Sequence, residues 1–210
     1  MAAKKTLTKK VSARKAPPKK APAKKVQRKR ASTAGKKPKS EDASAASVVT
    51  PVAIYAGSFD PVTNGHVDLI RRASRVFPKV TVAVAYNPNK GSGMFTPDER
   101  CEMIRESLAD LGDRVVADKF SGLLVDYAKG IGDCVLVRGL RAVSDFEFEF
   151  QMTSMNRHLA KEIETVFLMA GEQHFYTSSS LVREVATFGG DVTALVPPPV
   201  HRRLQKKLKL

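Results

Sequence analysis

Short hydrophobic runs alternate with longer amphipathic segments along most of this chain. Five runs rich in β-branched and apolar residues are typical of buried strands, and they lie at residues 52–56, 80–86, 114–118, 134–139 and 164–170. Between them, apolar residues recur with helical spacing at residues 66–77, 97–112, 123–132 and 145–163. This alternation predicts a Rossmann-like α/β fold, a parallel five-stranded sheet with helices on both faces. Ligands bind such sheets beyond the carboxyl ends of the strands.

The beginning of the chain has a different composition. Residues 1–40 contain 16 lysines and arginines and no acidic residue, whereas the rest of the chain has 20 basic and 21 acidic residues. The net charge of +15 therefore belongs to a tail. Residues 1–47 hold few large apolar side chains, so we expect a disordered tail there and one domain over residues 48–210. The tail can attract nucleic acid or another polyanion through residues 1–40, or act only as a solubilising extension.

Composition also argues against two classes of protein. No stretch approaches the roughly 18 to 20 apolar residues of a membrane span, and the N-terminus lacks the apolar region of a secretory signal. We therefore expect a cytoplasmic protein without membrane contact. No group of Asp, Glu, His and Cys has the spacing of a metal site, so we expect no metal held by the protein alone.

The loop after the first predicted strand carries the chemistry. Residues 55–66 read YAGSFDPVTNGH and open the first predicted helix. Backbone amides at a helix start, together with the helix dipole, favour a phosphate group there. Gly57 allows a sharp turn, and Thr63 or Asn64 can cap the helix. His66 then falls in the first turn, where it points toward the bound anion.

Several motifs resemble one family. TNGH at residues 63–66 matches the [HT]-x-G-H signature of the nucleotidyltransferase superfamily. Residues 52 to about 208 resemble bacterial phosphopantetheine adenylyltransferase, through GSFDPVTNGH, NPNK, MFTPDER, VRGLRAVSDFEFE, MNRHL and TSSSLVREV. The resemblance implies transfer of the adenylyl group from ATP to 4′-phosphopantetheine, giving dephospho-coenzyme A and pyrophosphate. Such a reaction needs positioning and electrostatic stabilisation rather than a protein nucleophile.

The resemblance also implies roles for individual residues. His66 hydrogen-bonds the α-phosphate and is the catalytic residue, while Ser58 touches both substrates. Lys90 and Arg138 hold the phosphate of phosphopantetheine, since ammonium and guanidinium groups suit that anion. Leu124 falls where the pantetheine arm is contacted, although a leucine on an apolar helical face is more often part of the core.

ATP contacts follow from the same resemblance. Glu149 can equally be an acid that faces water, and the three serines can simply cap a helix. His174 stands where the family commonly has an aromatic residue, usually Trp. The implied ATP-binding residues are Ser58, Phe59, His66, Gly139, Leu140, Arg141, Glu149, His174, Phe175, Tyr176, Thr177, Ser178, Ser179 and Ser180. The resemblance further implies Mg²⁺ arriving with ATP, and a homohexamer.

Two other interpretations stay open. The chain can be another member of the superfamily, such as a nicotinate-mononucleotide adenylyltransferase or a glycerol-phosphate cytidylyltransferase. It can also be a nucleic-acid-binding protein that acts through its basic tail.

Overall fold

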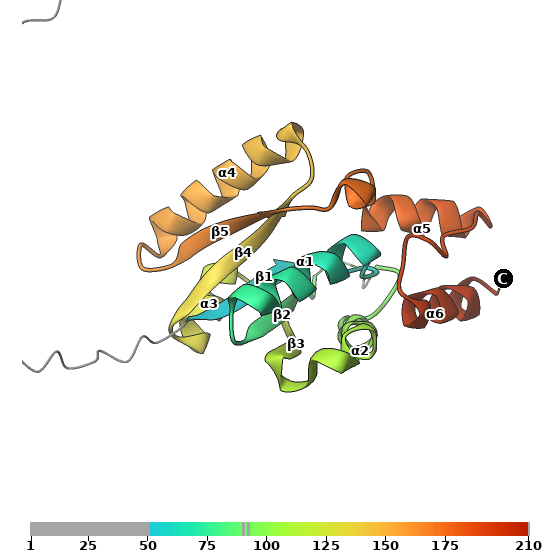
Figure 1. Ribbon diagram of the computed structural model, residues 1–210, viewed down its shortest axis with the longest axis horizontal. Coiled ribbons are helices and arrows are strands. Elements are labelled where there is room, and N and C mark those ends of the chain that lie inside the picture. The colour runs from blue at the N-terminus through green and yellow to red at the C-terminus, as the bar shows by residue number, and fades with distance from the viewer. Residues whose placement is uncertain (1–50, 90, 92, 210) are drawn as a thin grey trace, which may run out of the picture. The chain divides into compact units, whose positions relative to one another are not determined.

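The computed structural model describes residues 51–209 except residues 90 and 92. The tail expected over residues 1–47 lies outside the described residues. Five strands form one sheet in the order β3-β2-β1-β4-β5 (Figure 1). Their bounds are β1 Val52–Gly57, β2 Val80–Ala85, β3 Val115–Phe120, β4 Cys134–Leu140 and β5 Glu164–Met169.

Helices fill the connections between the strands. The α-helices are α1 Asn64–Val76, α2 Pro97–Ser107, α3 Leu124–Ile131, α4 Val143–Leu159, α5 Ser179–Thr187 and α6 Pro198–Leu208. Two short 3₁₀ helices are η1 Ala109–Arg114 and η2 Glu172–His174. Among the described residues, none of the helices has both the length and the apolar character to cross a membrane.

The sheet is parallel throughout. On one side of β1, Ala53 pairs with Val80 of β2, and on the other side Val52 pairs with Cys134 of β4. The carboxyl ends of the strands therefore meet at one edge of the sheet, with β1 in its centre. That edge is where the sequence predicts a binding site.

Side chains of each central strand alternate between two hydrophobic clusters. Ala53 and Tyr55 of β1 belong to a cluster with residues of α1, α2, α5 and α6, whereas Ile54 and Ala56 belong to a cluster with residues of α3. Both faces of the sheet are thus covered by helices. The predicted fold, a parallel five-stranded Rossmann-like sheet, is confirmed.

Three local predictions need correction. The helix expected over 145–163 ends at Leu159. The helix expected over 97–112 ends at Ser107 and is followed by η1, where Gly112 has a φ of +53° that a right-handed helix excludes. The helix α6 was not predicted at all. It begins with Pro198, a residue that suits the first turn of a helix, and it packs on α2 and α5 through buried Val200 and Leu204.

Candidate active site

A cavity of about 270 Å³ opens at the carboxyl ends of β1 and β4. Its walls come from the end of β1, the start of α1, the end of β4, α4 and the start of α5. Twelve residues that the sequence predicts as site residues line it, namely Ser58, Phe59, His66, Arg138, Gly139, Arg141, Glu149, His174, Thr177, Ser178, Ser179 and Ser180. Segments more than 100 residues apart in sequence thus converge on one space.

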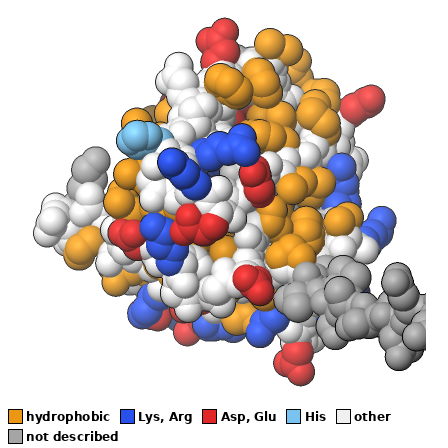
Figure 2. Space-filling model, turned by 90° about the vertical axis from the view of Figure 1, so that its left-hand side faces the viewer, with side chains coloured by type: hydrophobic (Ala, Val, Ile, Leu, Met, Phe, Trp, Pro, Cys, Tyr) orange, Lys and Arg blue, Asp and Glu red, His pale blue; other side chains and the backbone are white. Residues whose placement is uncertain are grey.

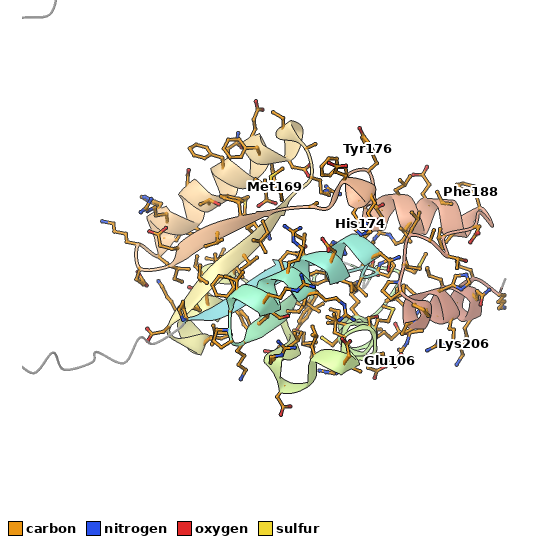
Figure 3. The ribbon with its side chains drawn as sticks, in the orientation of Figure 1. Glu106, Met169, His174, Tyr176, Phe188 and Lys206 are labelled. Carbon is orange, nitrogen blue, oxygen red and sulfur yellow. The ribbon has the colours of Figure 1, made fainter. Side chains whose placement is uncertain are left out.

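Other predicted site residues are not part of this wall. Leu140 and Phe175 are half-buried outside the lining, and Tyr176 is 90% exposed and points away from the molecule (Figure 3). Leu124 packs against the second hydrophobic cluster. Lys90 lies outside the described residues. The roles assigned to these five residues stay predictions.

Seven further residues line the cavity. Tyr55, Ala56, Gly57, Thr63 and Gly65 belong to the loop that the sequence indicated, but none of them was assigned a contact. Leu69 and Ala170 were not predicted. Leu69 was detectable in principle, because it lies three residues after His66 on the same side of α1.

The loop between β1 and α1 is shaped around Phe59. This residue is buried and has a φ of +46°, a left-handed conformation that is uncommon for a side chain of its size. A Cβ atom on Gly57 would lie only 3.1 Å from the Phe59 ring, so a larger residue there would have to displace the ring. The Phe59 ring in turn meets the His66 ring edge-on, with centroids 5.1 Å apart.

His66 closes the first turn of α1 through a capping box. The Thr63 hydroxyl accepts a hydrogen bond from the His66 N–H at 3.4 Å, and the Thr63 N–H donates to His66 Nδ1 at 3.0 Å. Of the two capping residues considered from the sequence, Thr63 is the one that caps. Because Nδ1 accepts from a backbone N–H, the proton of a neutral ring lies on Nε2. His66 therefore offers one N–H donor and no acceptor to the cavity.

The environment keeps this ring neutral. Burial, and to a smaller extent the positive charge of Arg141, together lower the pKa of His66 from 6.5 to about 4. Protonation would place a second cation beside Arg141. At neutral pH, His66 is thus an uncharged hydrogen-bond donor.

Two helices begin at the cavity. Gly65 and His66 line it from the start of α1, and Ser178–Ser180 line it from the start of α5. The amides of a first helical turn have no partner within the helix, and the two helix dipoles add positive potential. This arrangement suits a ligand with several phosphate groups.

The hydroxyl groups of Ser178, Ser179 and Ser180 make different hydrogen bonds. Ser178 caps α5, because its hydroxyl accepts from Leu181 N–H at 3.1 Å, and Ser179 donates to the carbonyl of Pro61 at 2.8 Å. Ser180 Oγ accepts from Arg183 at 3.3 Å, which leaves the hydroxyl proton of Ser180 available to a ligand. Capping and ligand binding are therefore compatible at this segment.

Arg138 is held firmly at the end of β4. Its Nε and Nη2 atoms donate to the two carboxylate oxygens of Glu149, both at 2.7 Å, and its Nη1 atom donates to the carbonyl of Ala56 at 2.8 Å. Three of its five N–H groups are used, so two stay available to an anion. Glu149, which the sequence suggested as an ATP contact or a water-facing acid, is mostly buried and pairs with Arg138 in the structure.

Arg141 lies between β4 and α4 and is anchored by α4 and by the segment before α5. Its Nε atom donates to Asp145 at 2.9 Å, and Nη1 donates to the carbonyl of Thr177 at 3.2 Å. Two guanidinium groups, one from each side of Gly139, thus face the cavity. A Cβ atom on Gly139 would collide with the side chain of Leu69, so the backbone passes close to α1 at this point.

The chain resembles known proteins of one superfamily. The model of the family described as Cytidylyltransferase-like matches residues 54–185, which contain both walls of the cavity. Solved structures agree in fold: a bifunctional NMN adenylyltransferase/ADP ribose pyrophosphatase from Francisella tularensis superposes with a TM-score of 0.61 at 14% identity, covering 77% of this chain and 50% of its own. The fold and the cavity thus define a nucleotidyltransferase.

Curated relatives narrow the class. Phosphopantetheine adenylyltransferase of Desulfosudis oleivorans is 52% identical over 157 residues, 75% of this chain and 92% of its own length. The enzyme of the same name from Anaeromyxobacter dehalogenans is 56% identical over 156 residues, 74% of this chain and 94% of its own length. The chain belongs to the phosphopantetheine adenylyltransferase family, which confirms the resemblance stated from its motifs.

The electronic state of His66 can be tested directly. We expect its ring to stay neutral from about pH 8 down to about pH 5.5, because burial and Arg141 oppose protonation. Ring chemical shifts followed by NMR across this range should show no titration of His66, whose signals are identified by their loss in His66→Gln. A midpoint near the ordinary value of 6.5 would contradict the interpretation.

Proposed function

We propose that this protein transfers the adenylyl group of ATP to 4′-phosphopantetheine, giving dephospho-coenzyme A and pyrophosphate. The observation that carries the proposal is the neutral His66, an N–H donor placed between two helix starts and two arginines. Both substrates are anions, and negative charge grows on the α-phosphoryl oxygens during the transfer. Positioned donors stabilise that charge without any covalent step on the protein.

The two sides of the cavity suit the two substrates. Ser180, Arg141 and the α5 helix start form one wall, where we place the phosphates of ATP. Arg138 forms the other wall, where it would hold the phosphate of phosphopantetheine together with Lys90. Ser58 and His66 line the same cavity, and we place them beside the α-phosphoryl group, where the nucleophilic phosphate approaches. The adenine and pantetheine contacts of Phe59, His174 and Leu124 are part of the same proposal.

Glu149 orients the guanidinium group of Arg138. A guanidinium group held by two carboxylate oxygens and one carbonyl can turn only its remaining N–H groups toward a substrate. We therefore assign Glu149 to orienting Arg138, and we give up the direct ATP contact as its main role.

Magnesium would come with the nucleotide. Among the described residues, no three His, Cys, Asp or Glu side chains lie together in a way that could hold a metal ion. Mg²⁺ is commonly bound through substrate phosphates and water, so ATP itself supplies suitable ligands. The bound ion would neutralise part of the phosphate charge, while the protein positions the α-phosphate through His66.

The proposal includes a homohexamer in the cytoplasm, where ATP is available. Support for assembly comes from large hydrophobic side chains that α4 and β5 expose, and Figure 2 shows a face on which hydrophobic side chains gather. The exposed side chains of these two elements are Val143, Phe146, Phe148, Phe150, Met152, Met155, Leu159, Val166 and Met169. Apolar patches of this kind mark contacts with other chains.

Substrate choice tests the proposed reaction. Pyrophosphate release should be fast with ATP, 4′-phosphopantetheine and Mg²⁺, and should have a kcat/KM at least about 100-fold lower when CTP replaces ATP or nicotinate mononucleotide replaces phosphopantetheine. Preference for either replacement would assign the chain to another reaction of the superfamily.

Glu149→Gln tests the orientation of Arg138. Loss of the paired carboxylate should raise the KM for phosphopantetheine by about tenfold, the size expected for charged hydrogen bonds, and leave the KM for ATP nearly unchanged. Glu147→Gln, on the same helix but exposed, serves as the control. A rise in the KM for ATP alone would return Glu149 to the role of an ATP contact.

The charge of the tail favours a second activity, non-specific binding of nucleic acid through residues 1–40. Sixteen basic residues without one acid give a strong attraction to phosphate backbones. The full chain should then bind duplex DNA with an affinity that falls steeply with salt, and deletion of residues 1–47 should abolish binding but not pyrophosphate release. Unchanged DNA affinity after the deletion would refute this activity and leave the solubilising role.

A further inference from the structure

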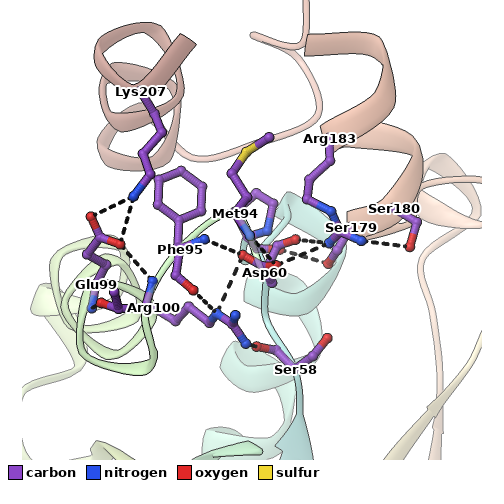
Figure 4. A network of polar contacts seen from close by, with 12 residues as sticks. Ser58, Asp60, Met94, Phe95, Glu99, Arg100, Ser179, Ser180, Arg183 and Lys207 are labelled. Atoms are coloured by element: carbon purple, nitrogen blue, oxygen red, sulfur yellow. Dashed lines mark hydrogen bonds and ion pairs between the residues drawn. The ribbon is translucent and has the colours of Figure 1, made fainter. Parts of the chain in front are cut away.

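Asp60 lies behind the cavity, outside its lining, and ties two parts of the chain together. It is only 5% exposed, and its carboxylate accepts hydrogen bonds from the backbone of the segment before α2. Met94 N–H donates to Oδ2 at 3.0 Å and Phe95 N–H donates to Oδ1 at 2.9 Å (Figure 4). The loop that carries Ser58 and Phe59 is thereby fixed to the loop after β2.

Two arginines from different helices reach the same carboxylate. Arg100 of α2 places Nε 3.4 Å from Oδ1, and Arg183 of α5 places Nη1 3.6 Å from Oδ2. Arg100 is as deeply buried as Asp60 and also donates to the carbonyl of Ser58 at 3.2 Å. Burying a guanidinium group without a carboxylate partner costs free energy of folding. Asp60 therefore also stabilises Arg100 in its buried position.

Arg183 connects Asp60 to the start of α5. Besides the carboxylate, its Nη1 atom donates to the backbone carbonyl of Asp60, and its Nη2 atom donates to Ser180 Oγ at 3.3 Å. Ser179 adds a second bond between α5 and the β1–α1 loop, because its hydroxyl donates to the carbonyl of Pro61. Figure 4 shows Arg183 and the two serines on the same side of Asp60.

The space around the carboxylate is full. Gly93 has a φ of +76°, and a Cβ atom there would collide with Asp60 Oδ2 and come within 2.7 Å of Arg100 Nη2. The backbone of the loop after β2 therefore passes directly against the carboxylate. Such close packing restricts all three segments that meet at this point.

We infer that Asp60 is a positioning residue. Through Arg183, it fixes the position of the α5 serines relative to the β1–α1 loop. The inference rests on the proposed function only in taking ATP as the ligand of the serine segment. Asp60 itself touches no substrate. Its effect is to fix the distance from Ser180 of α5 to Ser58 and His66 before ATP binds, which lowers the cost of ordering these residues.

ATP binding measured by calorimetry without the second substrate tests this inference. Asp60→Asn and Arg183→Gln should each weaken ATP binding by about tenfold, since each breaks charged hydrogen bonds of the link. The double variant should bind ATP about as tightly as whichever single variant binds it less tightly. The reason is that both substitutions break the same connection. Additive effects, or unchanged affinity in Arg183→Gln, would overturn the inference.

Controls separate positioning from general instability and from the proposed reaction. Arg71→Gln breaks an exposed ion pair with Asp110 on the outer side of α1 and should leave ATP binding unchanged. If Asp60→Asn does not fold, Arg183→Gln is sufficient to test the inference. We then expect a raised dissociation constant for ATP and an unchanged KM for phosphopantetheine. If the wild type binds ATP but releases no pyrophosphate, the proposed function fails while the ATP-binding comparison still tests Asp60.

Discussion

The reciprocal hydrogen bonds between Thr63 and His66 determine what this site can do. They begin α1 at the carboxyl end of β1, so the positive end of the helix dipole faces the cavity. They also fix the ring of His66 with its proton on Nε2, since Nδ1 is used by the Thr63 N–H. Burial and Arg141 then keep the ring uncharged. One local contact therefore sets the start of the helix, the tautomer and the direction of the donor.

Charge in the cavity is balanced rather than simply positive. Arg138 is paired with Glu149 and Arg141 with Asp145, so each cation is oriented before a substrate arrives. The potential that attracts phosphates comes from the two helix starts and from the N–H groups that these pairs leave available. Such preorganised donors stabilise developing charge more effectively than mobile ones, because they need no reorganisation during the reaction.

Features that depend on the local hydrophobic pattern could be predicted well from the sequence. Strands, most helices and the positions of His66 and Arg138 at the edge of the sheet follow from periodicity and from the rule that parallel strands bind ligands at their carboxyl ends. Asp60 was not predicted, because its partners Met94 and Arg183 lie 34 and 123 residues further along the chain. The pairing of Glu149 with Arg138 likewise depends on how α4 packs beside β4, which an acidic and aromatic helix pattern does not reveal.

The most direct test of the account is the effect of His66→Ala on the chemical step. ATP binding by the variant should change little, whereas kcat for pyrophosphate release should fall by about 10² to 10³-fold, as expected when one donor to the transition state is removed. A folded variant with nearly normal kcat would contradict the account. So would a loss of activity explained entirely by weaker ATP binding, because His66 would then serve the ground state alone.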